Sequence, residues 1–447
     1  MNNTYTTAEV LLRGIQNGTY DEQFKGLYGD SEATLTFQKE RYSKLISTFI
    51  DQFGASRECA LFSVAGRSEL SGNHTDHNHG CVIAASISLD IIAIASPRND
   101  SQICIHSEGF GMNRVDISTY TQPVEKKFGT SAALVAGVCV GFADRGYAIG
   151  GFDACTTSNV LKGSGLSSSA AFEDMVGTIL SHLYNGGGVD NVTISMISQF
   201  AENKFFGKPC GLMDQVACAY GGIVAIDFAD PTTPVIAPLP FDMSNAGYHL
   251  CIVDTGGNHA DLTDDYAAVP AEMKAVAKAL GGDVLRNVGE DELIAALPTV
   301  RRELGDRAAL RALHFFGENR RVADQKAALT AAIEAQKAGD EAALNAALDE
   351  YFGGVLASGR SSFCYLQNVY TTKNIAEQGL SLALCLAEKI LNGEGAFRVH
   401  GGGFAGTIQA YVPTALVDSF KATMDAVFGE GACADLTIRL VGACRLI

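Results

Sequence analysis

The spacing of apolar residues changes along the chain and separates helical from strand-like segments. Near residue 50, apolar positions recur at the spacing of one helix face, which predicts a helical N-terminal region: Leu45, Ile46, Phe49 and Ile50. After residue 58 the pattern changes to short apolar runs that are typical of strands: 60–65, 81–96 and 102–107. The first hundred residues therefore predict helices followed by a sheet.

Helical and strand patterns then alternate to the end of the chain. Helices are predicted at 132–144, after Ser167, and as an antiparallel pair within the Ala/Leu/Glu-rich stretch 309–348. Strands are predicted in four places, the last two flanking one more helix: 223–228, 249–254, 407–412 and 436–441. This interleaving predicts an α+β fold.

The length of the chain favours two domains. Its 447 residues exceed what one hydrophobic core usually organises. Proline and turn residues gather at 230–234 (Asp-Pro-Thr-Thr-Pro), so we expect an N-terminal domain at 1–229 and a C-terminal domain at 230–447.

Composition narrows the class of protein. Apolar residues make up 47% and charged residues 19%, which is typical of a packed globular protein. The net charge of −17 argues against nucleic-acid and anionic-membrane partners, because both surfaces are negative. No signal peptide or apolar run of about 18 residues is evident, and the 12 cysteines include no C-x-x-C pair. We therefore expect a cytoplasmic location.

The segment 161–173, LKGSGLSSSAAFE, is the most informative motif. Gly163 and Gly165 permit a tight turn, and three serines follow where a helix is predicted to begin. Free N–H groups at such a helix start favour an anion, and serine hydroxyls add phosphate or magnesium contacts. A glycine turn with an ordinary serine cap is the alternative.

A second motif, AGRSELSGNHTDHNHG at 65–80, gathers polar side chains after an apolar strand. Three histidines and a carboxylate could form a metal site. The same groups also suit sugar hydroxyls, and a solvated polar loop is the third interpretation. No further group with ligand spacing recurs downstream, which weakens the metal hypothesis.

The third motif, ENKFFGKPCGLMDQ at 202–215, contains two acids. Asp214 follows the apolar pair Leu212 and Met213, so it is expected to be partly buried, as a general base or a hydroxyl-orienting carboxylate often is. Glu202 is a candidate second acid for magnesium. Surface acids are the alternative for both residues.

Two nucleotide-binding patterns are not supported. Residues 401–406 read GGGFAG and formally match G-x-G-x-x-G, but the following TIQAYVP predicts a strand instead of the required helix. The Walker A pattern is absent, because proline follows Gly207-Lys208.

Taken in order, these motifs resemble the galactokinase family of GHMP kinases. The family patterns GRxNxxGEHxDYNxG, GxGLSSSAxxE, CGxMDQ and GGGFGG are similar to residues 66–80, 163–173, 210–215 and 401–406. The segment ENRRV at 318–322, followed by an AGD turn at 338–340, also looks like the family. The resemblance implies the GHMP fold, with an N-terminal and a C-terminal α+β domain and the active site between them.

The resemblance also implies a monomeric enzyme that transfers a phosphoryl group from ATP, with Mg²⁺, to the anomeric oxygen of galactose. Asp214 would act as the base and Arg67 would stabilise charge between the sugar and the phosphate. The implied ATP-binding residues are Gly163, Ser164, Gly165, Leu166, Ser167, Ser168 and Ser169, and the implied magnesium ligands are Ser169 and Glu202. The implied sugar-site residues are Asn73, His74, Asp76, Gly211, Asp214 and Tyr266.

The departures from the family pattern lie mostly in the sugar loop. The family's glutamate before histidine, which accepts a hydrogen bond from the C6 hydroxyl, is Asn73 here, while Glu69 and His77 replace an asparagine and a tyrosine. Near Tyr266, DDYAAVP replaces SEYPVRR, so two arginines are lost. An amide donates as well as accepts, so galacturonate is an alternative substrate to galactose.

Other functions remain alternatives. A non-catalytic galactose sensor is disfavoured, because such relatives are altered in the serine-rich loop and SSSAA is complete here. A metal hydrolase could be built on HTDHNH. Mevalonate and homoserine kinases fit less well, because CGLMDQ and the first motif are not expected in them.

Overall fold

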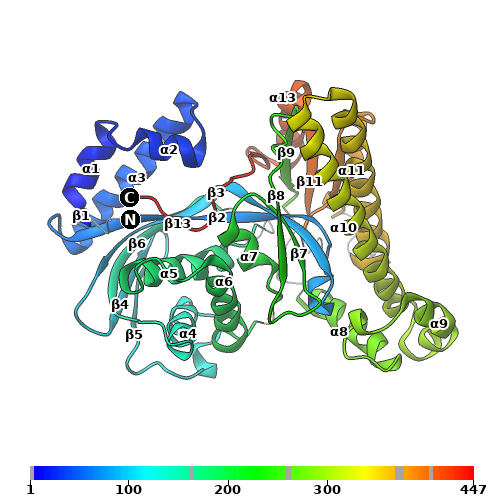
Figure 1. Ribbon diagram of the computed structural model, residues 1–447, viewed down its shortest axis with the longest axis horizontal. Helices are drawn as coiled ribbons and strands as arrows, with labels where there is room; N and C mark the ends of the chain where they lie inside the picture. Colours follow the sequence, from blue (N-terminus) through cyan, green and yellow to red (C-terminus); the bar gives the residue numbers. More distant parts are fainter. Residues whose placement is uncertain (1–4, 161–165, 209, 257–262, 368–376, 402–405) are drawn as a thin grey trace.

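The computed structural model describes residues 5–160, 166–208, 210–256, 263–367, 377–401 and 406–447. Within them the chain forms two sheets, one of nine strands and one of four, with helices on both faces of each (Figure 1). The α+β fold expected from the sequence is confirmed, since strands and helices alternate in both halves.

The larger sheet is built on two long antiparallel strands, β2 (Glu58–Ser71) and β3 (Cys81–Pro97). The other strands extend it on both sides: β1 (Thr6–Thr7), β4 (Gln102–Ser107), β5 (Gly111–Asp116), β6 (Phe152–Ser158), β7 (Ile223–Asp227), β8 (Val235–Leu239) and β13 (Cys444–Arg445). Nearly every residue of β2 and β3 is buried, because helices cover both faces of this sheet.

Two groups of helices cover the larger sheet (Figure 1). One face packs against the N-terminal helices α1 (Ala8–Gln16), α2 (Asp21–Tyr28) and α3 (Glu32–Phe53). The other face packs against α4 (Ser131–Asp144), α5 (Ser168–Tyr184), α6 (Asn191–Phe200) and α7 (Met213–Tyr220). A π-helical turn, Ala201–Phe206, continues α6.

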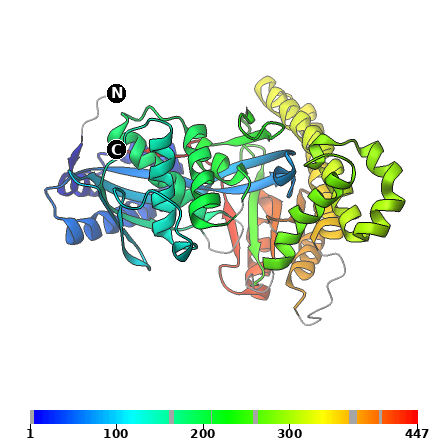
Figure 2. The same cartoon turned by 90° about the horizontal axis from the view of Figure 1, so that it is seen from below.

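The smaller sheet lies in the other half of the chain and runs β10 (Ala396–Val399), β11 (Thr407–Pro413), β9 (Tyr248–Asp254), β12 (Cys433–Leu436). One face packs against α12 (Gly379–Leu391) and α13 (Val417–Phe428). The other packs against the antiparallel pair α10 (Asp306–Ala338) and α11 (Glu341–Ser361). The remaining helices, α8 (Thr263–Ala279) and α9 (Glu290–Leu304), lie at one end of α10 (Figures 1 and 2).

Most predicted elements are confirmed, with one correction. The helical N-terminal region is divided into three helices, because Gly18 and Gly29 adopt positive φ angles of 80° and 91° where the chain turns. The strand predicted at 436–441 is wrong: β12 ends at Leu436. Arg439 lies beyond that end and binds Asp90 of β3 in the other sheet, and Ile438 forms an isolated bridge with Ile87. Leu440 and Val441 are exposed, so this apolar run crosses to the larger sheet instead of continuing β12.

The predicted domain boundary at residue 230 stays a prediction. Residues between β7 and β8 form the turn of a hairpin, in which Asp227 pairs with Val235 and Ile223 with Leu239. The hydrogen bonding therefore continues across residues 230–234, and the chain first changes sheet between Leu239 and Tyr248. No helix in the described segments is both long and apolar enough to span a membrane.

A buried ionic cluster joins three distant parts of the chain around Asp90. Its carboxylate accepts hydrogen bonds from Arg439 Nη1 at 3.0 Å and from the hydroxyl of Tyr28 at 2.6 Å, and Arg41 forms a further ion pair. Burial disfavours the charge, but the two arginines and hydroxyl donors outweigh it and hold the pKa of Asp90 below its ordinary value.

Candidate active site

Arg67, Asp214 and Ser167 form the centre of the site, and each comes from a different element. Arg67 lies in β2, Ser167 precedes α5, and Asp214 is in the first turn of α7. The Arg67 Nε and Nη2 atoms lie 2.8 and 2.7 Å from Asp214 Oδ1. The Ser167 hydroxyl donates to Asp214 Oδ2 at 2.5 Å. The structure therefore brings together a guanidinium, a carboxylate and a hydroxyl that the sequence analysis had singled out.

The environment of Asp214 favours its ionised form. Burial disfavours its charge, but Arg67 and the Ser167 hydroxyl outweigh burial and hold the pKa of Asp214 below its ordinary value. Its side chain keeps 32% of its surface exposed, whereas that of Arg67 keeps 7%. The carboxylate is therefore accessible to a ligand while its partner is held in place.

Glu202 is the second acid of the region and lies in the π-helical turn after α6. Its carboxylate is buried and accepts hydrogen bonds from Ser169 Oγ at 3.3 Å, Lys208 Nζ at 3.1 Å and Gln215 Nε2 at 2.9 Å. The predicted pairing of Ser169 with Glu202 is therefore seen as a direct contact. A hydroxyl and a carboxylate are hard oxygen donors of the kind that Mg²⁺ prefers, so these residues fit that ion.

The predicted phosphate loop is described only in part. Gly163, Ser164 and Gly165 lie outside the described residues. Leu166 is fully buried, and its carbonyl accepts a hydrogen bond from the backbone N–H of Arg67 at 3.3 Å, which ties the loop to β2. Ser168 begins α5 and the preceding Ser167 contacts Asp214, so the start of this helix lies beside Asp214. The first N–H groups of a helix have no partner within the helix and are available to an anion.

The sugar loop, defined here as residues 66–80, runs from β2 through a 3₁₀ turn, Asp76–Asn78, to β3. Asp76 lies against Gly211, where an added Cβ atom would fall 1.8 Å from Asp76 Oδ2. Glycine at 211 is therefore needed for this close approach. His74 adopts a left-handed φ of 59°, which turns the backbone between Asn73 and Asp76.

Asn73 has an unusual environment. Asn73 is 0% exposed, and neither its Oδ1 nor its Nδ2 atom has a hydrogen-bond partner among the residues that the structure describes. A buried amide without partners costs about 1–3 kcal/mol, so such groups usually have a ligand-binding or strain-related explanation. The orphaned amide makes Asn73 a candidate ligand contact.

Two further expectations for this region concern Tyr266 and a metal site. The side chain of Tyr266 lies outside the described residues. The rings of His74 and His77 lie 6.2 Å apart, and the described part of the chain contains no group of three or more His, Cys, Asp or Glu side chains that could hold a metal ion. The structure thus provides no support for the metal alternative at HTDHNH.

The sequence analysis missed the residues that hold the sugar loop from behind. They lie on α10 and contact 71–73: His314, Glu318 and Gln325. The available signal was a set of polar residues recurring at helical spacing in an otherwise apolar pattern, but such residues are ordinarily assigned to a solvated face.

A second connection behind the site joins β2 to the smaller sheet. Arg398 Nη2 lies 2.8 Å from Glu69 Oε1, and both side chains are buried. Ser68 Oγ lies 3.0 Å from His400 Nε2 and accepts a hydrogen bond from Gln409 Nε2 at 2.7 Å. The strand that carries Arg67 is therefore fixed against the other half of the protein.

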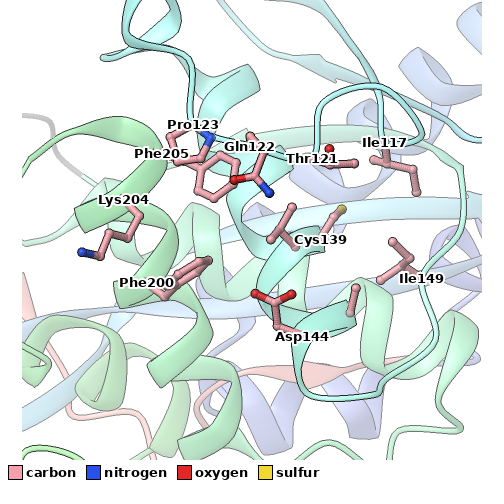
Figure 3. Close-up of a pocket in the computed structure, with 12 residues that line it drawn as sticks. Ile117, Thr121, Gln122, Pro123, Cys139, Asp144, Ile149, Phe200, Lys204 and Phe205 are labelled. Atoms are coloured by element: carbon pink, nitrogen blue, oxygen red, sulfur yellow. The ribbon is translucent and has the colours of Figure 1, made fainter.

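A separate cavity of about 420 Å³ lies among α4, the 117–123 segment and the turn after α6 (Figure 3). Its walls are mostly apolar, with Phe200, Phe205 and Ile149 among them, and Asp144 and Lys204 add charge. None of its lining residues is one of the predicted site residues, so this cavity is distinct from the Arg67–Asp214 centre.

Two family models match the chain. Residues 47–97 match the galactokinase galactose-binding signature, and residues 133–222 match the GHMP kinases N terminal domain. The first match includes the sugar loop, and the second includes Ser167, Glu202 and Asp214.

Known proteins are similar over most of the chain. A galactokinase of Streptomyces coelicolor is 31% identical, covering 89% of this chain and 97% of that protein. A galactokinase of Actinobacillus pleuropneumoniae is 30% identical, covering 83% and 90%. The crystal structure of Lactococcus lactis galactokinase with galactose has a TM-score of 0.73 at 24% identity, covering 89% and 98%. A mevalonate kinase structure has a TM-score of 0.55 at 12% identity, covering 85% and 99%.

Proposed function

Because this chain belongs to the galactokinase family, we propose that it transfers the γ-phosphoryl group of ATP to the anomeric hydroxyl of galactose. The observation that carries this proposal is the contact of Asp214 with Arg67 and with Ser167. Ser167 stands at the start of α5, the predicted phosphate-binding helix. Such a site works by positioning reactants and neutralising charge, with no covalent intermediate on the protein.

Asp214 and Arg67 would divide the work on the sugar. Asp214 is ionised, so it can accept the proton of the attacking hydroxyl. Arg67 holds Asp214 Oδ1 and keeps a positive charge beside it, which would stabilise negative charge that develops on the transferred group. The Ser167 hydroxyl donates to the other carboxylate oxygen, Asp214 Oδ2. When phosphate is bound, this hydroxyl would break that hydrogen bond or share it with a phosphate oxygen.

The residues around α5 and Glu202 would hold the phosphates. N–H groups at the start of α5, together with Ser168 and Ser169, suit the phosphate oxygens of ATP. Ser169 and Glu202 would hold Mg²⁺, which when bound neutralises charge on the phosphates. Lys208 now pairs with Glu202 and would be free to turn to a phosphate once the ion is bound.

The first test is ATP consumption by the purified protein with Mg²⁺, measured with galactose, galacturonate, galactosamine derivatives and glucose. The proposal expects turnover with a galacto-configured sugar, and none with ATP alone above the background rate. Absence of turnover with every sugar, in protein that still binds ATP, would contradict the proposal and favour a sensor.

Galacturonate is a second candidate substrate, because the buried Asn73 amide has no hydrogen-bond partner in the described part of the chain. In the family this position is a glutamate that accepts from the C6 hydroxyl, and it would repel a carboxylate at C6. The Asn73 Nδ2 group can instead donate to that carboxylate.

Asn73→Glu tests this specificity. If Asn73 faces C6, the substitution should lower kcat/KM for galacturonate relative to galactose by about 10- to 100-fold, because two like charges would meet in a desolvated site. Steady-state kinetics with both sugars measure the ratio. Asn113→Glu on β5 introduces the same charge away from the site and should leave the ratio unchanged. An unchanged ratio in Asn73→Glu would remove the assignment.

Gly211→Ala tests the contact between the sugar loop and the segment before α7. The new methyl group would overlap Asp76 Oδ2 and displace that carboxylate. We expect the KM for the sugar to rise by roughly 10- to 100-fold, since shifts of about 1 Å have effects of this size. Gly353→Ala is the matched control, because a Cβ atom there meets open space. Equal KM values in the two variants would contradict the role given to Asp76.

A further inference from the structure

Helix α10 carries a stripe of buried polar side chains that faces the sugar loop. His314, Glu318 and Gln325 follow one another at spacings of four and seven residues, which places them on one face of the helix. All three residues are buried, with relative exposures of 1%, 0% and 1%. Burying polar side chains costs more desolvation free energy than burying apolar ones, so helix packing alone does not explain this polar stripe.

Each member of the stripe binds a consecutive part of the sugar loop. Glu318 Oε1 accepts the backbone N–H of Gly72 at 3.1 Å. His314 Nε2 lies 2.9 Å from the carbonyl oxygen of Asn73. Gln325 accepts a hydrogen bond from the Ser71 hydroxyl. The backbone is therefore held at the Gly72 N–H and at the Asn73 carbonyl. Within the described residues, the Asn73 side chain between these two contacts has no hydrogen-bond partner.

The hydrogen bond from His314 has one possible direction. A carbonyl oxygen only accepts, so the proton must be on Nε2. Burial lowers the pKa of His314, which keeps the ring neutral. Nδ1 then accepts from the Ser361 hydroxyl of α11, 2.9 Å away. The orientation of the ring is thus set by α10, by α11 and by the loop at once.

The Glu318 carboxylate is also fixed by hydrogen bonds from neighbouring side chains. It accepts hydrogen bonds from Arg321 Nε at 2.7 Å and from the Ser358 hydroxyl of α11. Burial disfavours its charge, but Arg321, Arg398 and the Ser358 hydroxyl favour it, and the pKa of Glu318 lies below its ordinary value. The ionised carboxylate therefore accepts the hydrogen bond from the Gly72 N–H.

The same helix also holds α8, which carries the predicted sugar residue Tyr266. Arg311, one turn before His314, is 1% exposed and lies with its Nη1 atom 2.8 Å from Glu272 Oε2 of α8. Helix α10 therefore contacts two of the three segments that the sequence assigns to the sugar site, the sugar loop and α8.

From these contacts we propose that His314, supported by Glu318, is a positioning residue that sets the sugar affinity of the site by fixing the backbone at Asn73. This inference rests on the proposed function and concerns the same site. His314 touches neither reacting group; it acts through the loop. The role therefore belongs to sugar binding and should leave ATP binding unaffected.

His314→Leu tests the role by removing the donor while keeping an apolar side chain in the core. We expect the KM for the sugar to rise by about 10- to 100-fold, because the Asn73 carbonyl loses its partner and the loop can shift. The KM for ATP should stay within about twofold of the wild-type value, since the hydrogen bonds of Ser167 and Glu202 among the described residues go to α5, α7 and the segment that follows α6. His314→Gln, which restores an N–H donor, should recover most of the sugar affinity.

Ile333→Ala is the matched control, because Ile333 is buried on the same helix but lies far from His314 along it and packs into the apolar cluster with α11 and the smaller sheet. It should lower the melting temperature and leave the sugar KM unchanged. A folded His314→Leu protein with a wild-type sugar KM would overturn the inference, as would an equal rise in Ile333→Ala. If His314→Leu does not fold, Ser361→Ala replaces it: a rise in the sugar KM of several-fold is expected, and no rise overturns the inference. Absence of sugar turnover in the wild-type protein would instead overturn the proposed function.

Discussion

Asp214→Asn is expected to reduce sugar-dependent ATP turnover by about 10²- to 10⁴-fold, the usual contribution of a general base. The amide keeps the size of the carboxylate but cannot accept the proton of the attacking hydroxyl. It also leaves Arg67, whose side chain is 7% exposed, without its anionic partner. Coupled measurement of ADP release at saturating ATP and sugar gives kcat directly.

Asp227→Asn is a suitable control for that variant. Asp227 is also paired with an arginine, Arg286, at 2.9 Å, and its side-chain exposure of 38% is close to the 32% of Asp214. The same chemical change there should leave kcat within about twofold of wild type, because surface pairs contribute little. Activity of Asp214→Asn within tenfold of wild type would refute the assignment of Asp214 as the base.

The same assignment predicts a pH dependence. The pKa of Asp214 lies below its ordinary value of about 3.9, so the carboxylate is ionised and competent above that pH. Turnover that depends on it is lost only as the pH falls through the lowered pKa. The wild-type kcat/KM should therefore show no loss from Asp214 between pH 8 and about pH 5.

Asp90→Ala is expected to destabilise the protein by about 3–5 kcal/mol, because it leaves buried arginines without a counter-ion. Arg439 is 3% exposed and donates to Asp90 from a segment near the C-terminus, while Arg41 donates from α3. The cluster therefore connects the larger sheet to two distant segments. Urea denaturation followed by circular dichroism measures the change in the free energy of unfolding.

Asp100→Ala provides the comparison for a solvent-exposed pair. Asp100 binds Arg98 at 2.6 Å, but its side chain is 49% exposed, so its removal should destabilise the protein far less than removal of Asp90. Because the pKa of Asp90 is lowered, its contribution is present above the unfolded-state pKa of about 3.9 and is lost as the pH falls through the folded value. The gap between wild type and Asp90→Ala should be constant from pH 8 to about 5 and narrow below about pH 4. Equal losses for Asp90→Ala and Asp100→Ala would contradict this account.

Hydrophobic periodicity was enough to predict most elements of this protein. The apolar run at 81–96 predicted β3, and the Ala/Leu/Glu-rich stretch 309–348 predicted the antiparallel pair α10 and α11. This succeeds because period 2 and period 3.6 report which face of a strand or helix is buried. It failed at 436–441, where Arg439 crosses to the other sheet and the apolar Leu440 and Val441 are exposed.

The motifs likewise indicated which residues to examine and which family the chain belongs to, since each motif is a local run with its own backbone requirement. Their spatial relation lies outside that local information. Arg67 and Asp214 are 147 residues apart, and His314 lies 241 residues from the Asn73 carbonyl that it holds. A residue pattern carries the chemistry of a side chain and its burial, but not the partner that folding places against it. The orphaned amide of Asn73 and the polar stripe on α10 became visible only when the two halves of the chain were packed together, because hydrogen-bond satisfaction is a property of the packed interior.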